Sequence, residues 1–130
     1  MESKERREFF RINFHTPLTF KSCPADGPKQ GRLKEASAIS QNISPCGILF
    51  QTENKPPRLS SILWMNMDLR TLNICREIER RALIFKSGIL GRVVRVEEDP
   101  DASGYDIGVC FLTKDDQASR EVQKLLLEIS

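Results

Sequence analysis

The side chains best suited to bind a charged ligand lie in a basic segment near the N-terminus, Arg6-Arg7-Glu8-Phe9-Phe10-Arg11. Arg7 and Arg11 are four positions apart, so they project to the same side whether the segment is helical or extended. A guanidinium group pairs with phosphate oxygens or with the O6 and N7 edge of guanine, and its planar face stacks on purines. Taken alone, however, the segment is better explained as a solvated charge run in which neighbouring glutamates offset the arginines.

A second polar segment, Asn42-Ile43-Ser44-Pro45-Cys46-Gly47, begins 31 positions after Arg11, and we predict that it forms a loop. Asn42 and Ser44 are two positions apart, so they lie on one side of the chain if it is extended. Gly47 can adopt a positive φ and bring backbone amides close to a ligand. On its own, such a segment is an ordinary turn between strands.

No constellation of residues calls for catalysis. The single histidine, His15, has no Ser, Cys or carboxylate motif around it, and a lone histidine is more typical of a surface or capping position than of a general base. The sequence has no nucleophile elbow, Walker loop or G-x-G-x-x-G motif. Asp99 and Asp101 flank Pro100 in a predicted hairpin tip, where turn chemistry accounts for them. We therefore predict a non-enzyme with no catalytic residues and no cofactor.

Charge and cysteine usage exclude further classes of function. The net charge is +2, from 20 basic and 18 acidic side chains, which is too balanced to hold long DNA by charge alone. The sequence lacks both an apolar signal segment and an apolar run long enough to span a membrane, so we expect a cytoplasmic protein. A metal site is not expected, because the cysteines form no C-x-x-C pair and have no companion histidines. We predict buried, reduced thiols for all of them: Cys23, Cys46, Cys75 and Cys110.

The length and composition predict one domain. The chain has 130 residues, of which 39% are apolar and 29% charged, enough for a core without disulfides or metal ions. We assign residues 1–14 to a charged N-terminal arm and residues 15–130 to a single domain. Within it, residues 63–69 and 105–111 alternate with a period of two, which predicts strands with one buried and one exposed face. Residues 93–96 are predicted to pair with the second of these strands as a hairpin.

Residues 73–88 carry two conflicting patterns. Ile74, Ile78 and Ala82 suit the apolar stripe of a helix, whereas residues 83–85 suit a strand that enters the hairpin. We predict a strand, a loop and a second strand.

The C-terminal residues 114–129 are predicted to form one amphipathic helix. Thr113 can cap its start, and Asp115 and Asp116 lie near the positive end of its dipole. Apolar residues recur on one face at spacings of three and four: Ala118, Val122, Leu125, Leu126 and Ile129. About six short strands followed by one helix predict a mainly β fold, a small six-stranded antiparallel β-barrel with a C-terminal α-helix.

Together, the two polar segments resemble the signature of PilZ domains, bacterial receptors for cyclic di-GMP: R-x-x-x-R followed by (D/N)-x-S-x-x-G near the start of a small β-barrel. The segments Gly91-Arg92-Val93-Val94-Arg95-Val96 and Tyr105-Asp106-Ile107-Gly108-Val109-Cys110-Phe111 are similar to the later strand pair of that family. The resemblance thus covers nearly the whole chain.

The resemblance implies a set of ligand-binding residues. Arg7 and Arg11 match the first motif, and three residues match the second motif without substitution: Asn42, Ser44 and Gly47. In this family, an arginine directly before the first motif, here Arg6, tends to accompany binding of an intercalated pair of cyclic di-GMP molecules. We therefore expect a dimeric ligand. Asparagine in place of aspartate at position 42 keeps an amide oxygen to accept a guanine N–H.

The resemblance also suggests a ligand-gated adaptor. We expect the N-terminal arm to be mobile without ligand and to order on binding, so that a surface for an unidentified downstream protein is exposed or hidden. Candidate anchors of the arm on the barrel are Phe9, Phe10, Ile12 and Phe14.

Two other functions remain open at this stage. One is a PilZ-like interaction module that binds no nucleotide; the arginines of the first motif count against it. The other is a small barrel that binds single-stranded nucleic acid, which would need aromatic and basic residues interleaved on one face. The sole Trp and Tyr, Trp64 and Tyr105, lie in strand patterns that packing explains.

Overall fold

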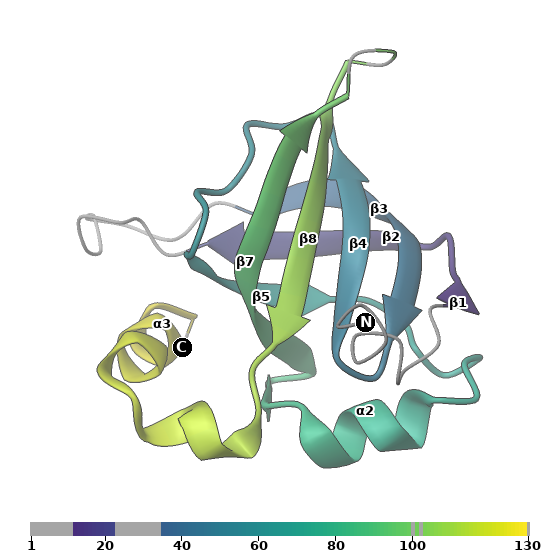
Figure 1. Cartoon of the computed structure of the whole chain (residues 1–130). Helices are drawn as coiled ribbons and strands as arrows, with labels where there is room; N and C mark the ends of the chain where they lie inside the picture. Colours follow the sequence, from purple (N-terminus) through teal and green to yellow (C-terminus); the bar gives the residue numbers. More distant parts are fainter. Residues whose placement is uncertain (1–11, 23–34, 100, 102, 130) are drawn as a thin grey trace, which may run out of the picture.

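The structure, a computed structural model, describes residues 12–22, 35–99, 101 and 103–129. Strands contain more of the described residues than helices do, and the helices come after the first five strands (Figure 1). The elements are β1 (Ile12–Asn13), β2 (Pro17–Ser22), β3 (Glu35–Ser44), β4 (Gly47–Thr52), β5 (Ile62–Asn66), α2 (Cys75–Arg81), β6 (Ile84–Phe85), β7 (Gly88–Glu98), β8 (Tyr105–Phe111), the 3₁₀ helix η1 (Lys114–Ala118) and α3 (Arg120–Ile129).

Six strands close into an antiparallel barrel in the order β3-β2-β5-β7-β8-β4, and the pairing of β4 with β3 completes the ring. β1 adds to β3, and β6 adds to β7. The predicted six-stranded barrel with a C-terminal helix is confirmed. β8 has the predicted bounds, and its alternation places Ile107, Val109 and Phe111 in the core while Cys110 is exposed.

β5 departs from the predicted alternation, because both of its faces are buried. Instead of spanning residues 63–69, the strand ends at Asn66. Leu63 and Met65 pack in the main barrel core, whereas Trp64 belongs to a second cluster with Val122 and Leu125 of α3. The amphipathic helix therefore covers the outer face of β5, and apolar residues are favourable on both sides of the strand.

The predicted single helix over residues 114–129 is interrupted at Ser119. The 3₁₀ helix η1 ends there with extended backbone, and the Ser119 hydroxyl accepts the N–H of Val122 (3.2 Å) at the start of α3. Ala118 is therefore exposed, not part of the buried stripe. Thr113 does cap the start, because its N–H donates to the carboxylate of Asp116 (2.8 Å) in a capping box.

Residues 75–81 form a helix, so the predicted strand, loop and strand over residues 73–88 is wrong at its start. Ile78 is fully buried in the barrel core, with Ile74 and Cys75 packed beside it, and α2 lies across one end of the barrel (Figure 1). The residues form a helix and not a strand, because the apolar stripe of a helix can cover the open end of the barrel.

Two further features concern the N-terminal strand and the cysteines, and the cysteines differ from expectation. β1 lies inside the predicted arm of residues 1–14, and the half-buried Ile12 and Phe14 pack against the core as predicted anchors, while Phe9 and Phe10 lie outside the described residues. None of the described cysteines is buried, because Cys46 and Cys75 are half-buried and Cys110 is exposed; Cys23 is not described. Among the described helices, none is long and apolar enough to cross a membrane.

The β6–β7 hairpin turns through Lys86 and Ser87, which have φ values of 50° and 66°. Two consecutive left-handed residues define a type I′ turn, for which Asn-Gly is favoured and Lys-Ser is strained. Replacing Lys86 with Asn and Ser87 with Gly should therefore raise the free energy of unfolding by about 1 kcal/mol. Urea denaturation of both proteins measures the change; an unchanged or lower midpoint would contradict the strain.

Candidate ligand-binding site

The second polar segment forms the tip of the β3–β4 hairpin, so the predicted loop over residues 42–47 is wrong. β3 continues to Ser44, residues 45–46 make the turn, and Gly47 pairs with Ser44 as the first residue of β4. The Ser44 hydroxyl accepts the N–H of Cys46 (3.1 Å) across the turn. Only two residues of the motif are therefore outside regular strand structure.

Asn42 and Ser44 face the outside of the barrel. Ile43 between them is fully buried, and successive side chains of a strand point to opposite faces. A register shift between Ser40 and Asn42 precedes them. The two polar side chains therefore lie on one side, as predicted from their spacing.

Gly47 is required by the close approach of β8, not by a left-handed backbone. Its φ lies outside the positive range, and a Cβ at this position would come within 2.3 Å of the carbonyl oxygen of Val109. Gly47 therefore does not use the positive φ that glycine can adopt. The absence of a side chain lets β4 and β8 pair directly beneath the hairpin tip.

β1 joins the barrel beside this motif. Ile12 pairs with Ile43, and Asn13 pairs with Asn42. Arg11 directly precedes Ile12 in the sequence, so the R-x-x-x-R motif is followed at once by the strand that pairs with the N-x-S-x-x-G motif. The arginines of the first motif, Arg6, Arg7 and Arg11, themselves lie outside the described residues.

The strand register extends this surface across β4, β8 and β7. Two rows of paired residues cross these strands. One row begins at Ser44 and the other at Asn42, and each row ends at an arginine on β7. Each row contains one glycine, which keeps the surface shallow. We call this outer surface the motif face; its rows are Ser44, Gly47, Cys110 and Arg92, and Asn42, Leu49, Gly108 and Arg95. Leu49, Arg92 and Arg95 were not predicted from the sequence. Their place beside the motif follows only from the register of the hairpins.

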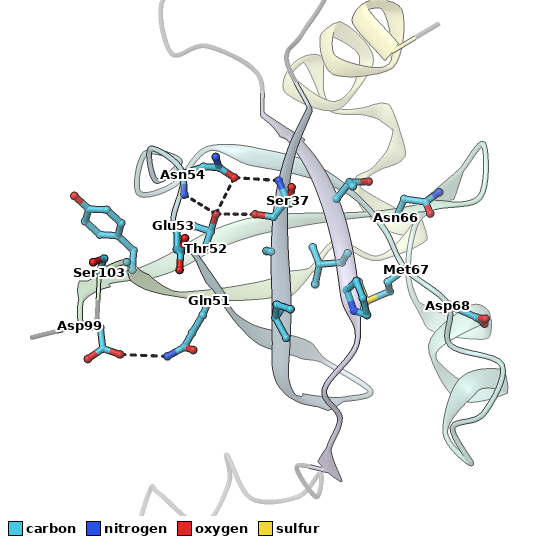
Figure 2. A pocket seen from close by; sticks show the side chains of 17 residues that line it. Ser37, Gln51, Thr52, Glu53, Asn54, Asn66, Met67, Asp68, Asp99 and Ser103 are labelled. Carbon is cyan, nitrogen blue, oxygen red and sulfur yellow. Dashed lines mark hydrogen bonds between the residues drawn. The ribbon is translucent and has the colours of Figure 1, made fainter. Parts of the chain in front are cut away.

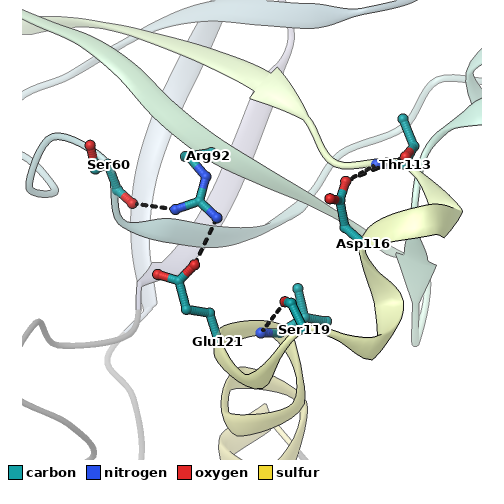
Figure 3. A network of polar contacts seen from close by, with 7 residues as sticks. Ser60, Arg92, Thr113, Asp116, Ser119 and Glu121 are labelled. Carbon is teal, nitrogen blue, oxygen red and sulfur yellow. Dashed lines mark hydrogen bonds and ion pairs between the residues drawn. The ribbon is translucent and has the colours of Figure 1, made fainter.

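Both arginines of the motif face already have acidic partners. Arg92 donates from Nη2 to Glu121 of α3 (2.8 Å) and from Nη1 to the carbonyl oxygen of Ser60 (2.9 Å), as Figure 3 shows. Arg95 binds Glu97 at 2.7 Å. The hydrogen bond from Arg92 lowers the pKa of Glu121 below its usual value, and the pKa of Arg92 is raised in return. An anion on the motif face would therefore depend on further cations for charge neutralisation.

The sequence matches the family model of the PilZ domain over residues 5–128. The chain belongs to the PilZ domain family. Members of this family are binding and regulatory modules and are generally not enzymes. The match includes both motifs and extends from the N-terminal arginines into α3.

One solved structure supports the same fold, and two others are reported for comparison. The Bacillus subtilis inhibitor of motility (MotI/DgrA) matches with a TM-score of 0.56 and 16% identity, covering 95% of this chain and 50% of that one. The K. pneumonia MrkH complex with cyclic di-GMP matches at 0.49 and 16%, covering 95% and 51%. The PilZ domain of Escherichia coli YcgR with cyclic di-GMP matches at 0.44 and 14%, covering 95% and 89%. The chain thus spans about half the length of the first two. Curated proteins give no significant match.

Proposed function

We propose that this PilZ domain is a cyclic di-GMP receptor whose binding site comprises Arg6, Arg7, Arg11, Asn42, Ser44 and Gly47. The observation that carries the proposal is the register of β1 on β3, where Asn13 pairs with Asn42. This register brings the chain that follows the first motif to the second motif, as a shared site requires. Membership of a family of cyclic di-GMP receptors supports the same assignment.

The chemistry of the two motifs is complementary to the ligand. Cyclic di-GMP has two phosphates and two guanines, and arginine binds both groups through its planar fork. The amide oxygen of Asn42 accepts a guanine N–H. Ser44 accepts the N–H of Cys46, which leaves its hydroxyl hydrogen to donate to a ligand oxygen. Gly47 lets β4 approach the backbone of β8 closely at the base of the hairpin tip that carries Asn42 and Ser44.

The ligand is proposed to bind as an intercalated dimer, with Arg6 neutralising the additional phosphates and stacking on a second guanine. Replacing Arg6 with Leu should reduce the stoichiometry from two molecules of cyclic di-GMP per chain to one. Isothermal titration calorimetry measures this number directly. A stoichiometry of one for the unaltered chain would contradict dimer binding and leave the receptor function intact.

The output is proposed to be a change in the arrangement of the N-terminal arm that alters docking of a downstream protein in the bacterial cytoplasm. Phosphate charges neutralise the arginines of the arm, and Ile12 and Phe14 connect the arm to the barrel core. The downstream protein would respond to this arm together with the adjacent hairpin.

Titration with cyclic di-GMP tests the proposed function. We expect binding that weakens with salt, because several arginine–phosphate contacts contribute. The absence of heat and of NMR shifts at millimolar ligand would favour an interaction module that binds no nucleotide. A short oligonucleotide that binds more tightly than cyclic di-GMP would instead favour a single-stranded nucleic-acid barrel.

A further inference from the structure

A groove lies on the outer wall of the barrel, over β2 and β3, away from the hairpin tip with the second motif. Its volume is about 880 Å³, and its floor includes Thr19 of β2 and Ile39 of β3. Residues that follow β5 form one side, and the end of β4 together with the β7–β8 turn forms the other (Figure 2). The groove therefore joins five segments that are separated in the sequence: residues 17–19, 37–39, 51–54, 66–68, and 99 with 103–105.

The groove carries negative charge. Three carboxylates line it, those of Glu53, Asp68 and Asp99, and no Lys or Arg does so among the described residues. Arg70 binds both carboxylate oxygens of Asp68, at 2.9 and 2.8 Å, so one wall is largely neutralised. Glu53 and Asp99 form no ion pair with another described residue, and the negative potential is concentrated on their side.

A hydrogen-bond network holds this acidic wall in place. Gln51 donates from Nε2 to Asp106 (2.7 Å) and to Asp99 (3.4 Å), as Figure 2 shows for Asp99. The N–H of Asp101 donates to the other carboxylate oxygen of Asp99 (3.0 Å). On the same wall, the buried Thr52 hydroxyl donates to the carbonyl oxygen of Ser37 (2.8 Å). The carboxylate of Asp99 is therefore held by hydrogen bonds to both of its oxygens, which lowers the entropy lost on binding.

The floor of the groove presents one exposed apolar side chain, that of Ile39, near the polar Thr19. Ile39 is 48% exposed in the middle of a strand that is paired on both sides. Contact with water does not stabilise this apolar side chain, so it is available for contact with a partner. Because the backbone groups of β2 and β3 are paired within the barrel, an incoming chain cannot add as a strand and must bind through side chains. At the floor, an apolar side chain of the bound chain can pack against Ile39.

The walls are too open for a small molecule. Ser37, Glu53, Asn54 and Asn66 are all exposed, whereas sites for small ligands bury most of the ligand surface. An extended peptide can follow the groove and make contacts along its length. The lining therefore fits a peptide that carries both apolar and cationic side chains.

We propose that the groove is a docking site for an extended cationic segment of a partner protein, with an apolar side chain on Ile39 and Lys or Arg side chains on Glu53 and Asp99. Ile39 lies three positions before Asn42 on β3, so the docked segment would border the motif face. Docking does not require cyclic di-GMP. A negative result for docking would therefore leave the proposed receptor function intact, and the reverse also holds.

The test uses a labelled octapeptide of alternating lysine and valine, followed by fluorescence polarisation and by ¹H–¹⁵N NMR shift mapping on the full chain. We expect shifts concentrated at Ile39, Glu53, Asp99 and Tyr105, and binding that weakens about threefold between 50 and 200 mM salt. A glutamate–valine octapeptide should not bind. Shifts centred elsewhere, or equal binding of the two peptides, would overturn the proposal.

Matched variants distinguish the groove from general charge attraction. Glu53→Gln with Asp99→Asn should weaken the lysine–valine peptide at least fivefold, whereas Glu79→Gln with Asp115→Asn, which removes the same charge at exposed positions on α2 and η1, should change it less than twofold. Ile39→Thr keeps a β-branched residue in the strand and should also weaken binding. Spermidine that binds at the groove as tightly as the peptide would show a site for small cations and contradict the peptide proposal.

Discussion

Replacing both Arg7 and Arg11 with alanine should reduce the affinity for cyclic di-GMP by at least about 100-fold, because hydrogen bonds to charged groups contribute roughly 1.5–3 kcal/mol each. The structure explains why other residues would not compensate. The two arginines that the structure does place on the motif face, Arg92 and Arg95, are held by Glu121 and Glu97 at 2.8 and 2.7 Å. Calorimetric titration at a fixed salt concentration measures the loss.

The same double variant should keep the stability of the barrel. Residues 7 and 11 precede β1, and the core described here is formed by residues from Ile12 onward. We expect the free energy of unfolding to change by less than about 0.5 kcal/mol, as is usual for surface positions. A large loss of stability would show instead that the arm is part of the folded domain.

A matched control separates specific contacts from loss of positive charge. Arg58→Ala with Arg120→Ala removes the same charge from exposed positions outside the motif face. This control should weaken binding less than threefold. If it weakened binding as much as the Arg7 and Arg11 variant, long-range attraction and not the first motif would account for the affinity.

The elements that were predictable from the sequence are those whose pattern is local. β8 alternates with a period of two and is followed by a capping box at Thr113, and both signals involve neighbouring residues only. β5 was predicted wrongly because α3, about 60 residues later in the chain, covers its outer face at Trp64. No local pattern in β5 could reveal that cover.

The prediction for α2 was wrong for a similar reason. Ile74, Ile78 and Ala82 did indicate a helix, but the short strand β6 follows at once, and the two patterns overlap in a few residues. The decision comes from tertiary structure, since Ile78 is buried against the barrel core. A seven-residue helix has little intrinsic stability and depends on such packing.

For the candidate site, the spacing of the motifs selects candidate residues but does not predict their surroundings. The two-residue turn after Ser44 makes Asn42 part of a ladder, and this ladder connects the motif to Leu49 and Arg95 through β4, β8 and β7. Such a connection depends on the strand register, because a shift of the register by one residue moves every side chain to the opposite face of the sheet. The bulge in β7 between Val93 and Arg95 is a shift of this kind and has no evident signal in the sequence.

Replacing Gly47 with alanine should lower both stability and ligand affinity. The new Cβ would lie 2.3 Å from the carbonyl oxygen of Val109, a backbone atom that cannot rotate away, so β4 and β8 must separate at the hairpin tip. Overpacking of this kind costs about 1–3 kcal/mol, which corresponds to a Tm lower by roughly 5–15 °C. Thermal unfolding followed by circular dichroism measures the shift.

The loss of affinity follows from the same displacement. Moving Gly47 also moves its pairing partner Ser44, and with it the Asn42 side of the motif face. Binding of cyclic di-GMP should weaken about tenfold by calorimetry at a temperature well below the Tm. Gly108→Ala is the comparison, because its Cβ would meet the Cβ of Arg95 at 3.1 Å, a milder contact than a collision with backbone. It should therefore cost less stability and leave Asn42 and Ser44 in place. Equal losses in the two variants would contradict a special role for the close approach at Gly47.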